Sequence, residues 1–395
     1  MSVNRRRRLL TVGHSYCISL NRRLAHEIAA TGEWEVTAVG PARFRGDFGW
    51  NVLEPDAAEA CRVIPVPVHI SRPVHLMIYG RQLKALLQQQ PWDLVHCWEE
   101  PYVAAAGQVA LATPSAVPIV FATFQNIEKR YPPPFRWIEQ YALARAAGIV
   151  AFGRTAHEVV VERAPLGTPV QVISPGVDVR RFHADAGAQA RIRRQYGWSD
   201  RTPIVGFLGR LVSEKGCALL TRALDRLGVP WRALFVGAGP LEADLRHWAL
   251  RHPGRVRIES GLGHEQVAEY LNAMDVLCAP SQTTASWREQ FGRMIVEAFA
   301  CGTPVIASDS GELPHVVADA GLLVPEGNEA KWARAITTLL TDERLRDELR
   351  RRGQQRAVEH FAWPSIARQH LQFFDQILSG PGCSQLGSHG ALRSA

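Results

Sequence analysis

The sequence predicts an α/β protein made of two domains, each built around a doubly wound parallel sheet. Short apolar runs alternate with amphipathic helical patterns along most of the chain, which is typical of parallel strands joined by helices. The alternation stops at the Pro- and Gly-containing segment 174–178 and starts again at residue 204. The 395 residues are enough for two hydrophobic cores. Because ligands bind at the carboxyl ends of the strands in such sheets, we expect the two domains to face a central cleft.

The first domain, residues 1–175, is predicted from its apolar runs and helical periodicities. Its predicted strands are Leu9–Val12, Glu35–Val39, Leu94–His96, Pro118–Ala122, Gly148–Ala151 and Val170–Ile173. Its predicted helices are Leu20–Thr31, Gly80–Gln90 and Ile138–Ala147.

The second domain, residues 176–360, repeats the same kind of pattern without being a sequence repeat of the first. Its predicted strands are Ile204–Arg210, Trp231–Val236, Arg255–Glu259, Val276–Ala279, Pro304–Ala307 and Gly321–Val324. From residue 330 to about Val358 the pattern is helical, and 361–364 interrupts it. The last predicted helix, about 361–378, is expected to cross back to the first domain. Residues 379–395 are rich in Gly and Ser and predict a disordered tail.

Composition excludes several classes of protein. With 46% apolar and 21% charged residues, the chain has the profile of a soluble globular protein, neither disordered nor fibrous. No apolar run approaches the roughly 20 residues of a membrane-spanning helix, and the first residues do not resemble a signal peptide. The seven cysteines are scattered singly, without metal-binding spacing. We therefore expect reduced, mostly buried thiols in a cytoplasmic protein.

The net charge of +7 comes largely from one short cluster, Arg5–Arg8, while the rest of the chain is nearly balanced. We interpret the cluster as a solvated tail beside the first strand, which at most helps a peripheral contact with an anionic membrane. No basic stripe predicts a nucleic-acid partner. Only four of the 45 basic residues are lysines, so a lysine at a strand end is notable.

One of these lysines lies in the strongest local motif, Gly209–Gly216. The motif follows an apolar strand and opens a helix, so Gly209 allows the backbone to turn close to a ligand. Arg210 and Lys215 then lie near a positive helix N-terminus. This arrangement suits a diphosphate and needs no metal, and the chain contains no clear Asp-x-Asp metal motif. The alternative is a surface turn with incidental charges.

Two glutamates form the second motif, because Glu289 and Glu297 flank the predicted start of a helix near Gly292. Glu297 would lie on the second turn and Glu289 in the preceding loop. Carboxylates and the free amides near Phe291 and Gly292 are suitable partners for sugar hydroxyls. The apolar residues after Glu297 favour a buried helix rather than a solvated surface.

Together these motifs resemble the donor-binding domain of retaining GT-B glycosyltransferases of family 4, also called group 1 glycosyl transferases. The resemblance rests on Gly209-Arg210 with Glu214-Lys215-Gly216, on Gly237-Ala238-Gly239-Pro240, on Ala279-Pro280-Ser281, on the two glutamates running into 300–307, and on Gly311-Glu312. It is looser in the first domain, where Gly13-His14-Ser15-Tyr16 and Asp93–His96 carry it. It implies two Rossmann-like domains.

The resemblance also implies a role for each motif. Gly209, Gly237, Arg210 and Lys215 would bind the donor diphosphate, and Glu297 its ribose. Glu289 and the amides of Phe291 and Gly292 would bind the transferred sugar, and Gly13 would approach the phosphates from the other domain. No metal or other cofactor is expected. In the front-face route often proposed for the family, the leaving diphosphate accepts the acceptor's proton, and configuration is retained.

The first domain departs from the family pattern at Trp98, where many members have a histidine that contacts the donor sugar. Either Glu99 or Glu100 substitutes for that histidine, or the contact is dispensable. His96 either hydrogen-bonds an acceptor or packs in the core.

The roles of two segments of the first domain also stay open. Tyr131–Trp137 lines an acceptor channel, touches a bilayer or forms a rigid loop before the next helix, and the loop is the favoured interpretation. Pro73–Lys84 is a peripheral membrane contact or a core helix.

The predicted function is a metal-independent, retaining glycosyltransferase of the hexosyltransferase type. It would use a nucleotide-sugar donor and a glycan, lipid-linked or small-molecule acceptor in glycan, polysaccharide or glycolipid assembly. We expect it in the cytoplasm or at the inner face of the membrane. The alternatives are a GT-B phosphorylase or nucleotide-sugar epimerase, and a catalytically silent nucleotide-sugar-binding protein.

Overall fold

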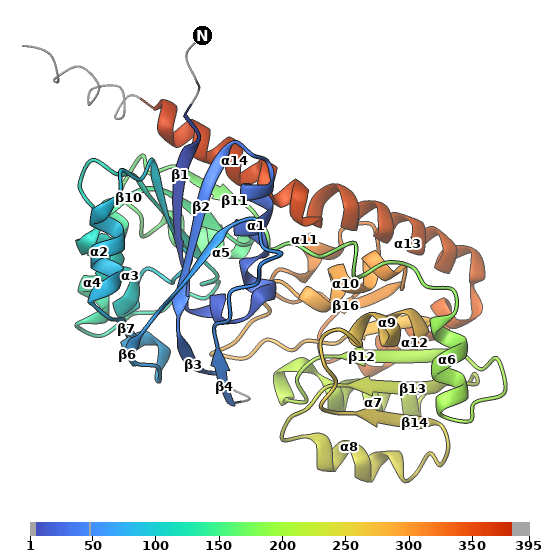
Figure 1. Cartoon of the computed structure of the whole chain (residues 1–395). Helices are drawn as coiled ribbons and strands as arrows, with labels where there is room; N and C mark the ends of the chain where they lie inside the picture. Colours follow the sequence, from blue (N-terminus) through green and yellow to red (C-terminus); the bar gives the residue numbers. More distant parts are fainter. Residues whose placement is uncertain (1–4, 47–48, 381–395) are drawn as a thin grey trace, which may run out of the picture. The chain divides into compact units, whose positions relative to one another are not determined.

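The computed structural model describes residues 5–46 and 49–380 and divides into two compact units (Figure 1). The first unit combines the chain up to Ser174 with the chain from Ile366 onward, and the second covers Pro175–Ser365. The division lies beside the boundary expected at residue 175. Of the predicted tail, residues 381–395 lie outside the described part.

The first unit contains a seven-stranded parallel sheet in the order β11-β10-β9-β8-β1-β2-β5. Its strands are β1 (Arg7–Val12), β2 (Trp34–Pro41), β5 (Arg62–Val66), β8 (Leu94–Cys97), β9 (Ile119–Thr123), β10 (Ala146–Ala151) and β11 (Val170–Val172). The sequence analysis missed β5, whose Pro65 argues against a strand. Proline is tolerated there because β5 is an edge strand.

Helices connect these strands, as expected for a doubly wound sheet. They are α1 (Arg23–Ala30), α2 (Arg81–Gln89), α3 (Ala104–Ala112), α4 (Phe135–Arg145) and α5 (Arg154–Val161). Two small antiparallel pairs are inserted, β3 (Arg43–Gly46) with β4 (Gly49–Val52), and β6 (Val68–Ile70) with β7 (Ile78–Tyr79).

Three predicted boundaries in this unit are corrected. The predicted helix from Leu20 is split, because a 3₁₀ turn, Ser19–Arg22, precedes α1. Helix α4 begins at Phe135 instead of Ile138, directly after Pro134. A proline suits the position just before a helix because it has no N–H group to leave unpaired. The end of Tyr131–Trp137 is therefore the first turn of α4 rather than loop, and β10 starts at Ala146 instead of Gly148.

The segment Pro73–Lys84 is not one amphipathic helix. It forms a 3₁₀ turn, Val74–Leu76, then β7 and the start of α2. Met77, Tyr79 and Leu83 are buried in the core. Leu76 and Ile78, by contrast, are exposed. Only part of the apolar half therefore packs the unit, and a membrane contact by the segment stays a prediction.

The second unit contains a six-stranded parallel sheet in the order β14-β13-β12-β15-β16-β17. Its strands are β12 (Ile204–Leu208), β13 (Arg232–Val236), β14 (Val256–Glu259), β15 (Val276–Ala279), β16 (Val305–Ser308) and β17 (Leu322–Val324). All six match the predicted strands to within two residues at each end. Each unit is a Rossmann-like domain, as the sequence predicts.

Helices cover both faces of this second sheet. They are α6 (Ala188–Gln195), α7 (Cys217–Asp225), α8 (Glu242–Ala249), α9 (Val267–Ala273), α10 (Arg293–Cys301), α11 (Leu313–Val317), α12 (Glu329–Thr341) and α13 (Glu343–Arg356). One core includes residues of α9, α10 and α11, and the other includes residues of α7, α8 and α12. Two cores explain why the strands are apolar on both faces.

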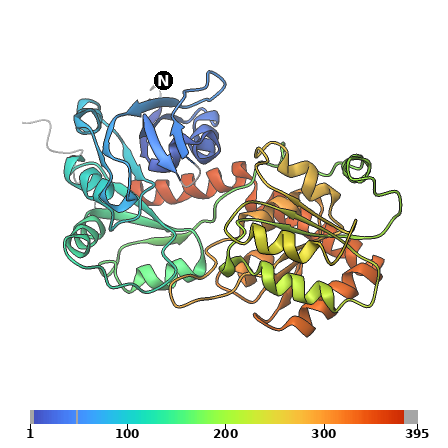
Figure 2. The same ribbon diagram turned by 90° about the horizontal axis from the view of Figure 1, so that it is seen from below.

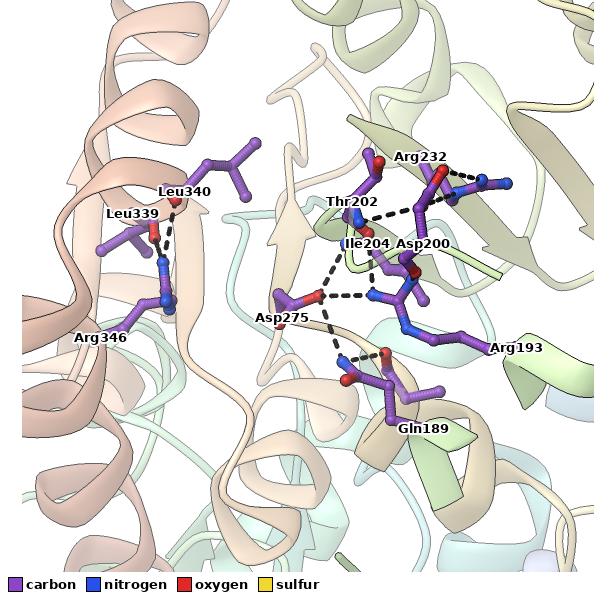
Figure 3. Close-up of polar contacts among 11 residues, drawn as sticks. Gln189, Arg193, Asp200, Thr202, Ile204, Arg232, Asp275, Leu339, Leu340 and Arg346 are labelled. Atoms are coloured by element: carbon purple, nitrogen blue, oxygen red, sulfur yellow. Dashed lines mark hydrogen bonds and ion pairs between the residues drawn. The ribbon is translucent and has the colours of Figure 1, made fainter. Parts of the chain in front are cut away.

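Polar contacts fix the amino ends of β12 and β15 (Figure 3). Asp275, just before β15, accepts a hydrogen bond from the Ile204 amide at 2.8 Å and from Gln189 at 3.2 Å. Arg193 lies 3.8 Å from the same carboxylate. These contacts set the register between the two central strands, and so position whatever lies beyond their carboxyl ends.

The chain returns to the first unit through α14 (Trp363–Ser379), which lies across that unit's sheet (Figure 2). A π-helical turn, Ala357–Phe361, ends the preceding helical stretch, as the interruption at 361–364 predicts. Phe374 of α14 packs against Trp34, with ring centres 6.1 Å apart. The helix thus completes the first unit.

The Arg5–Arg8 cluster is not a free tail. Arg5 donates to both oxygens of Asp93, at 2.7 and 3.0 Å, and Arg8 pairs with Glu35 at 3.3 Å. Arg7 pairs with Asp375 of α14. Three of the four charges are therefore paired with carboxylates of the same unit. The six cysteines in the described part are buried and unbridged, as predicted.

Candidate active site

The strand order reverses between β1 and β8 in the first unit and between β12 and β15 in the second. In open α/β sheets ligands bind beyond the carboxyl ends of the strands at such a reversal. The predicted site residues gather at these two places, and each is described within its own unit.

A buried ion pair lies at the reversal of the second unit. Lys215 Nζ is 2.6 Å from Glu289 Oε2, and the Ser281 hydroxyl donates to the same oxygen at 2.8 Å. The side chains of Lys215 and Glu289 are only 14% and 7% exposed. Lys215 Nζ also lies 5.0 Å from the centre of the Trp287 ring. The lysine predicted to bind a diphosphate is thus held by the glutamate predicted to bind a sugar.

Two glycines allow the backbone to approach this closely. Gly216 has φ of +75°, and a Cβ there would lie 1.8 Å from the Pro280 carbonyl oxygen. Gly237 has φ of +145°, and a Cβ there would lie 1.9 Å from the carbonyl oxygen of Gly209. Any larger residue would force apart the loops that follow β12, β13 and β15.

Arg210 differs from Lys215, although the sequence pairs them. Its side chain is 49% exposed, and its nearest carboxylate is Glu214, with an N–O distance of 3.6 Å. Arg210 is therefore free to turn toward a ligand, whereas Lys215 is already oriented.

Helix α10 carries the second glutamate as predicted. Gly292 precedes it with φ of +78°, and the helix runs from Arg293 to Cys301. Glu289 lies in the loop before the helix and Glu297 on its second turn, and each residue is 5% exposed. Phe291 is buried against Phe361, with ring centres 5.9 Å apart, so only its backbone remains for a ligand.

Sequence reasoning missed the partners of these glutamates. His264 Nε2 lies 3.3 Å from Glu297 Oε1, and Arg181 Nη1 lies 3.0 Å from His264 Nδ1. The contacts of Ser281 and Trp287 with the Lys215–Glu289 pair were also missed, although Ser281 belongs to the motif Ala279-Pro280-Ser281 of the family resemblance. Only the fold brings these four side chains to the glutamates and Lys215.

The first unit has a different pair at its reversal. Val12 of β1 lies opposite Cys97 of β8, so the residues after the two strands are neighbours. Glu99 accepts from the backbone amide of His14 and contacts its Nδ1, both at 2.5 Å. The Glu99 side chain is 1% exposed, and that of His14 is 30% exposed.

Burial and the neighbouring Glu99 shift the pKa of His14 in opposite directions. Burial lowers the pKa of the His14 ring, but the charge and hydrogen bond of Glu99, with the charge of Glu100, outweigh burial and raise the pKa above its ordinary value. His14 is thus an imidazolium over a wider pH range than a free histidine. Two glutamates were considered as substitutes for the missing histidine. Of these, Glu99 is the one that contacts His14.

Gly13, predicted to approach the phosphates, is fixed between aromatic rings. A Cβ on Gly13 would lie 3.1 Å from the Trp98 Cβ and 3.1 Å from the Tyr16 ring. Trp98 itself packs on Phe152, with ring centres 4.6 Å apart. In place of the family's histidine, the chain thus has a packing residue.

His96 matches the packed alternative. It is 1% exposed, and its ring lies within 6 Å of the rings of Trp98, His370 and Phe374. Burial, together with the nearby His370, keeps the pKa of His96 well below its usual range. His96 is therefore a neutral core residue in this structure, and a contact with an acceptor would require it to leave the core.

Glu100 points away from His14, toward the end of β9. It accepts from the Thr123 hydroxyl at 2.7 Å and from the Phe124 amide at 2.6 Å. Burial raises the pKa of Glu100 to about 7, although these hydrogen bonds oppose the shift. Glu100 therefore fixes the loop after β9.

Across residues 5–46 and 49–380, no three His, Cys, Asp or Glu side chains are grouped to hold a metal ion. Over the same ranges, no helix is both long and apolar enough to cross a membrane.

Two family models match the chain. The model of "Glycosyl transferases group 1" matches residues 188–356, and that of "Glycosyltransferase Family 4" matches residues 21–181. The first match spans the Lys215–Glu289 pair and the second spans Glu99. The chain belongs to the group 1 glycosyltransferases.

Curated group 1 relatives resemble part of the chain. An alpha-maltose-1-phosphate synthase of Mycolicibacterium smegmatis is 29% identical over 61% of this chain and 66% of its own length. A D-inositol 3-phosphate glycosyltransferase of Corynebacterium jeikeium is 28% identical over 73% of this chain and 70% of its own. The chain thus spans about two thirds of the length of these relatives.

A solved structure shows the same fold over nearly the whole chain. Anabaena Alr3699/HepE in complex with UDP has a TM-score of 0.72 and 18% identity, and the alignment covers 94% of this chain and all of that one. At this identity the likeness shows the fold alone, which is the GT-B fold.

Proposed function

We propose that this protein transfers a sugar from a nucleotide-diphosphate sugar to a hydroxyl of an acceptor. The observation that carries the proposal is the buried Lys215–Glu289 pair at the strand-order reversal of the second unit. A buried ion pair is costly to desolvate and adds little net stability. Its position at a ligand-binding edge supports a role in binding. The complex of Alr3699/HepE with UDP supports a nucleotide donor.

The two cations act on the diphosphate. Lys215 has three donors, and Glu289 and the Trp287 ring engage only part of its hydrogen-bonding capacity. The remaining donors and the exposed Arg210 neutralise the charge that develops on the leaving diphosphate, which is the largest expected contribution to catalysis. Gly209 and Gly237 keep this edge open to the phosphates.

The glutamates bind hydroxyl groups. Glu297 accepts from the ribose, and His264 keeps its carboxylate oriented. Glu289 accepts from hydroxyls of the transferred sugar, next to the backbone amides of Phe291 and Gly292 before α10. In the first unit, Gly13 approaches the phosphates and Glu99 positions His14. The sugar is a hexose in this proposal.

The reaction proceeds with retention and without a metal. The bond between the anomeric carbon and the diphosphate oxygen breaks, and the acceptor oxygen bonds to the same face of the carbon. The acceptor's proton passes to the departing diphosphate, so no protein nucleophile is required. The protein contributes charge stabilisation and alignment of the acceptor.

The acceptor is a glycan, a lipid-linked intermediate or a small molecule, in glycan, polysaccharide or glycolipid assembly. The names of the relatives refer to phosphorylated sugars and inositols. We take these names to favour a lipid-linked intermediate or a small molecule as the acceptor. We place the protein in the cytoplasm, with peripheral contact at an anionic membrane where the acceptor is lipid-linked.

The test uses the full chain with a panel of UDP-, GDP- and ADP-sugars. At 100 times its dissociation constant the correct donor stabilises the fold by about 2.7 kcal/mol, which thermal denaturation detects. Lys215→Ala should abolish this shift, whereas Glu343→Gln, an exposed change on α13, should leave it intact. A shift that Lys215→Ala leaves unchanged contradicts the proposed site.

Product analysis then separates the alternatives. Transfer to an added acceptor supports a glycosyltransferase. Phosphate-dependent release of the sugar identifies a phosphorylase, and interconversion of the free donor identifies an epimerase. Binding without turnover of any kind identifies a silent nucleotide-sugar-binding protein.

A further inference from the structure

A recess of about 440 Å³ lies in the first unit, beyond the carboxyl end of β9 and beside α4. It is lined by Lys129, Arg130, Tyr131, Arg136, Glu139, Gln140, Leu143 and Arg163. Four of these eight side chains are cations and one is an acid. The proposed donor site uses none of them.

Three of the cations have no partner of their own. Lys129, Arg130 and Arg136 are exposed, and none forms an ion pair or side-chain hydrogen bond with any residue in 5–46 or 49–380. Lys129 is one of only four lysines in the chain. Like charges that converge on one recess repel each other, and a bound anion relieves the repulsion.

Contacts of Arg163 hold the wall of the recess in place. Arg163 donates to Glu139 at 2.6 Å, and its other amino group donates to the Lys129 carbonyl oxygen. The Arg163 guanidinium also lies 5.3 Å from the centre of the Tyr131 ring. The side chains of Arg163 and Glu139 are 19% and 16% exposed. The acid is thus engaged by Arg163, and the other three cations remain for a ligand.

Tyr131 offers a second indication of a ligand. Its hydroxyl is buried, yet it has no hydrogen-bond partner in the described part of the chain. A buried hydroxyl without a partner is costly, and the charged groups that act on this one are Glu100, Glu139 and Arg163. Its ring is stacked on Tyr102, with centres 4.1 Å apart. Because Tyr102 and Arg163 already cover the ring, it is not a platform for a nucleic-acid base.

We propose that this recess binds a phosphate group carried by the acceptor. The proposal rests on the proposed function, since it names the substrate class of the same reaction. Three unpaired cations suit a phosphate, which carries up to two negative charges and accepts several hydrogen bonds. A recess of about 440 Å³ also admits the sugar or polyol to which the phosphate is attached. The phosphate belongs either to a free phosphorylated small molecule or to a lipid headgroup.

Binding is measured by calorimetry with inorganic phosphate, glucose 1-phosphate and glucose. The Lys215→Ala variant serves as the background, so that phosphate does not bind at the donor site. We expect saturable binding of both phosphates and none of glucose. Lys129→Ala with Arg130→Ala should weaken the binding at least about tenfold, the equivalent of one charge-assisted hydrogen bond.

The matched control is Arg81→Ala with Lys84→Ala. This pair also removes one arginine and one lysine from exposed positions of the first unit, at the start of α2. It should leave phosphate binding unchanged. An equal loss in the two double variants, or binding of glucose as tight as that of glucose 1-phosphate, overturns the proposal.

A second arm identifies the source of the phosphate. Cosedimentation compares vesicles of phosphatidylcholine alone with vesicles of phosphatidylcholine and phosphatidylinositol. Binding to the mixed vesicles that Lys129→Ala with Arg130→Ala abolishes, and the control pair does not, identifies a lipid-borne phosphate. Phosphate binding without vesicle binding identifies a free one. Neither arm involves donor turnover. Failure of phosphate binding at the recess can therefore be distinguished from failure of the proposed function in the donor assay.

Discussion

Glu289 of the second unit and Glu99 of the first occupy comparable places, each beyond the strand that adjoins the first strand of its sheet. Both are buried carboxylates, but Glu289 is paired with Lys215 and Glu99 with His14. A histidine changes charge within the physiological pH range, and Glu99 raises the pKa of His14 against the effect of burial. The comparison shows a lysine–glutamate pair at one reversal point and a histidine–glutamate pair, whose histidine titrates, at the other.

The glycines at the two reversal points should differ in how much a substitution destabilises the fold. Gly216→Ala should be the most damaging single change, because its φ is +75° and its Cβ would overlap the Pro280 carbonyl. We expect a loss of about 3 kcal/mol or more in the free energy of unfolding. Gly13→Ala should cost about 1 kcal/mol, since its backbone is extended and its Cβ meets side chains at 3.1 Å. Chemical denaturation measures both, and equal losses would remove this difference between the units.

The Lys215–Glu289 pair should matter most for activity. Glu289→Gln keeps the shape of the side chain but removes the charge that orients Lys215. In the proposed function the same charge accepts from the donor sugar. We expect turnover to fall about 100-fold or more. Initial rates with the donor found in the panel measure this, with Glu343→Gln as control. An initial rate within a factor of two of the parent's would mean that Glu289 does not bind the donor sugar.

The His14–Glu99 pair should have a smaller, pH-dependent effect on activity. In Glu99→Gln the main cause that raises the pKa of His14 is lost, so burial should then lower it. We expect activity to fall about tenfold and its pH profile to move to lower pH. Nuclear magnetic resonance of the His14 ring follows the pKa directly. An unchanged pKa would mean that Glu99 only packs the loop.

The stability of the first unit should depend weakly on pH through the same pair. Because the folded pKa of His14 is raised, its contribution is fully present below the unfolded pKa, near 6.5. It is lost as the pH rises through the folded pKa. We expect the difference in unfolding free energy between the parent and His14→Gln to be about 1 kcal/mol in acid and to vanish in mild base. A difference that grows with pH contradicts this assignment.

Much of the second unit could be predicted from the sequence. Its strands are uninterrupted apolar runs buried on both faces, and the spacing of Glu289 and Glu297 around Gly292 is a local property of the start of α10. The partners could not be predicted. His264 meets Glu297, and Ser281 meets Glu289, only because the sheet brings separate loops together.

The first unit was harder to predict for the same reason. The contact between His14 and Glu99 depends on the register of β1 against β8, which no local pattern contains. The strand β5 was missed because its proline argues against a strand. The cationic recess depends on where α4 begins, and the start of that helix was predicted three residues too late.

The return of the chain has a consequence for the protein's modularity. The second unit begins and ends at one place, since the amide of Val177 donates to the Phe361 carbonyl at 2.7 Å and Val177 pairs with Ala362. Trp363 packs on Gly176, where a Cβ would lie 2.4 Å from the ring. The segment 175–365 is therefore a cassette with joined ends. Exchange for the corresponding segment of a relative would cut the chain at adjacent points. Under the proposed function, the resulting hybrid enzymes would use a new donor and the original acceptor.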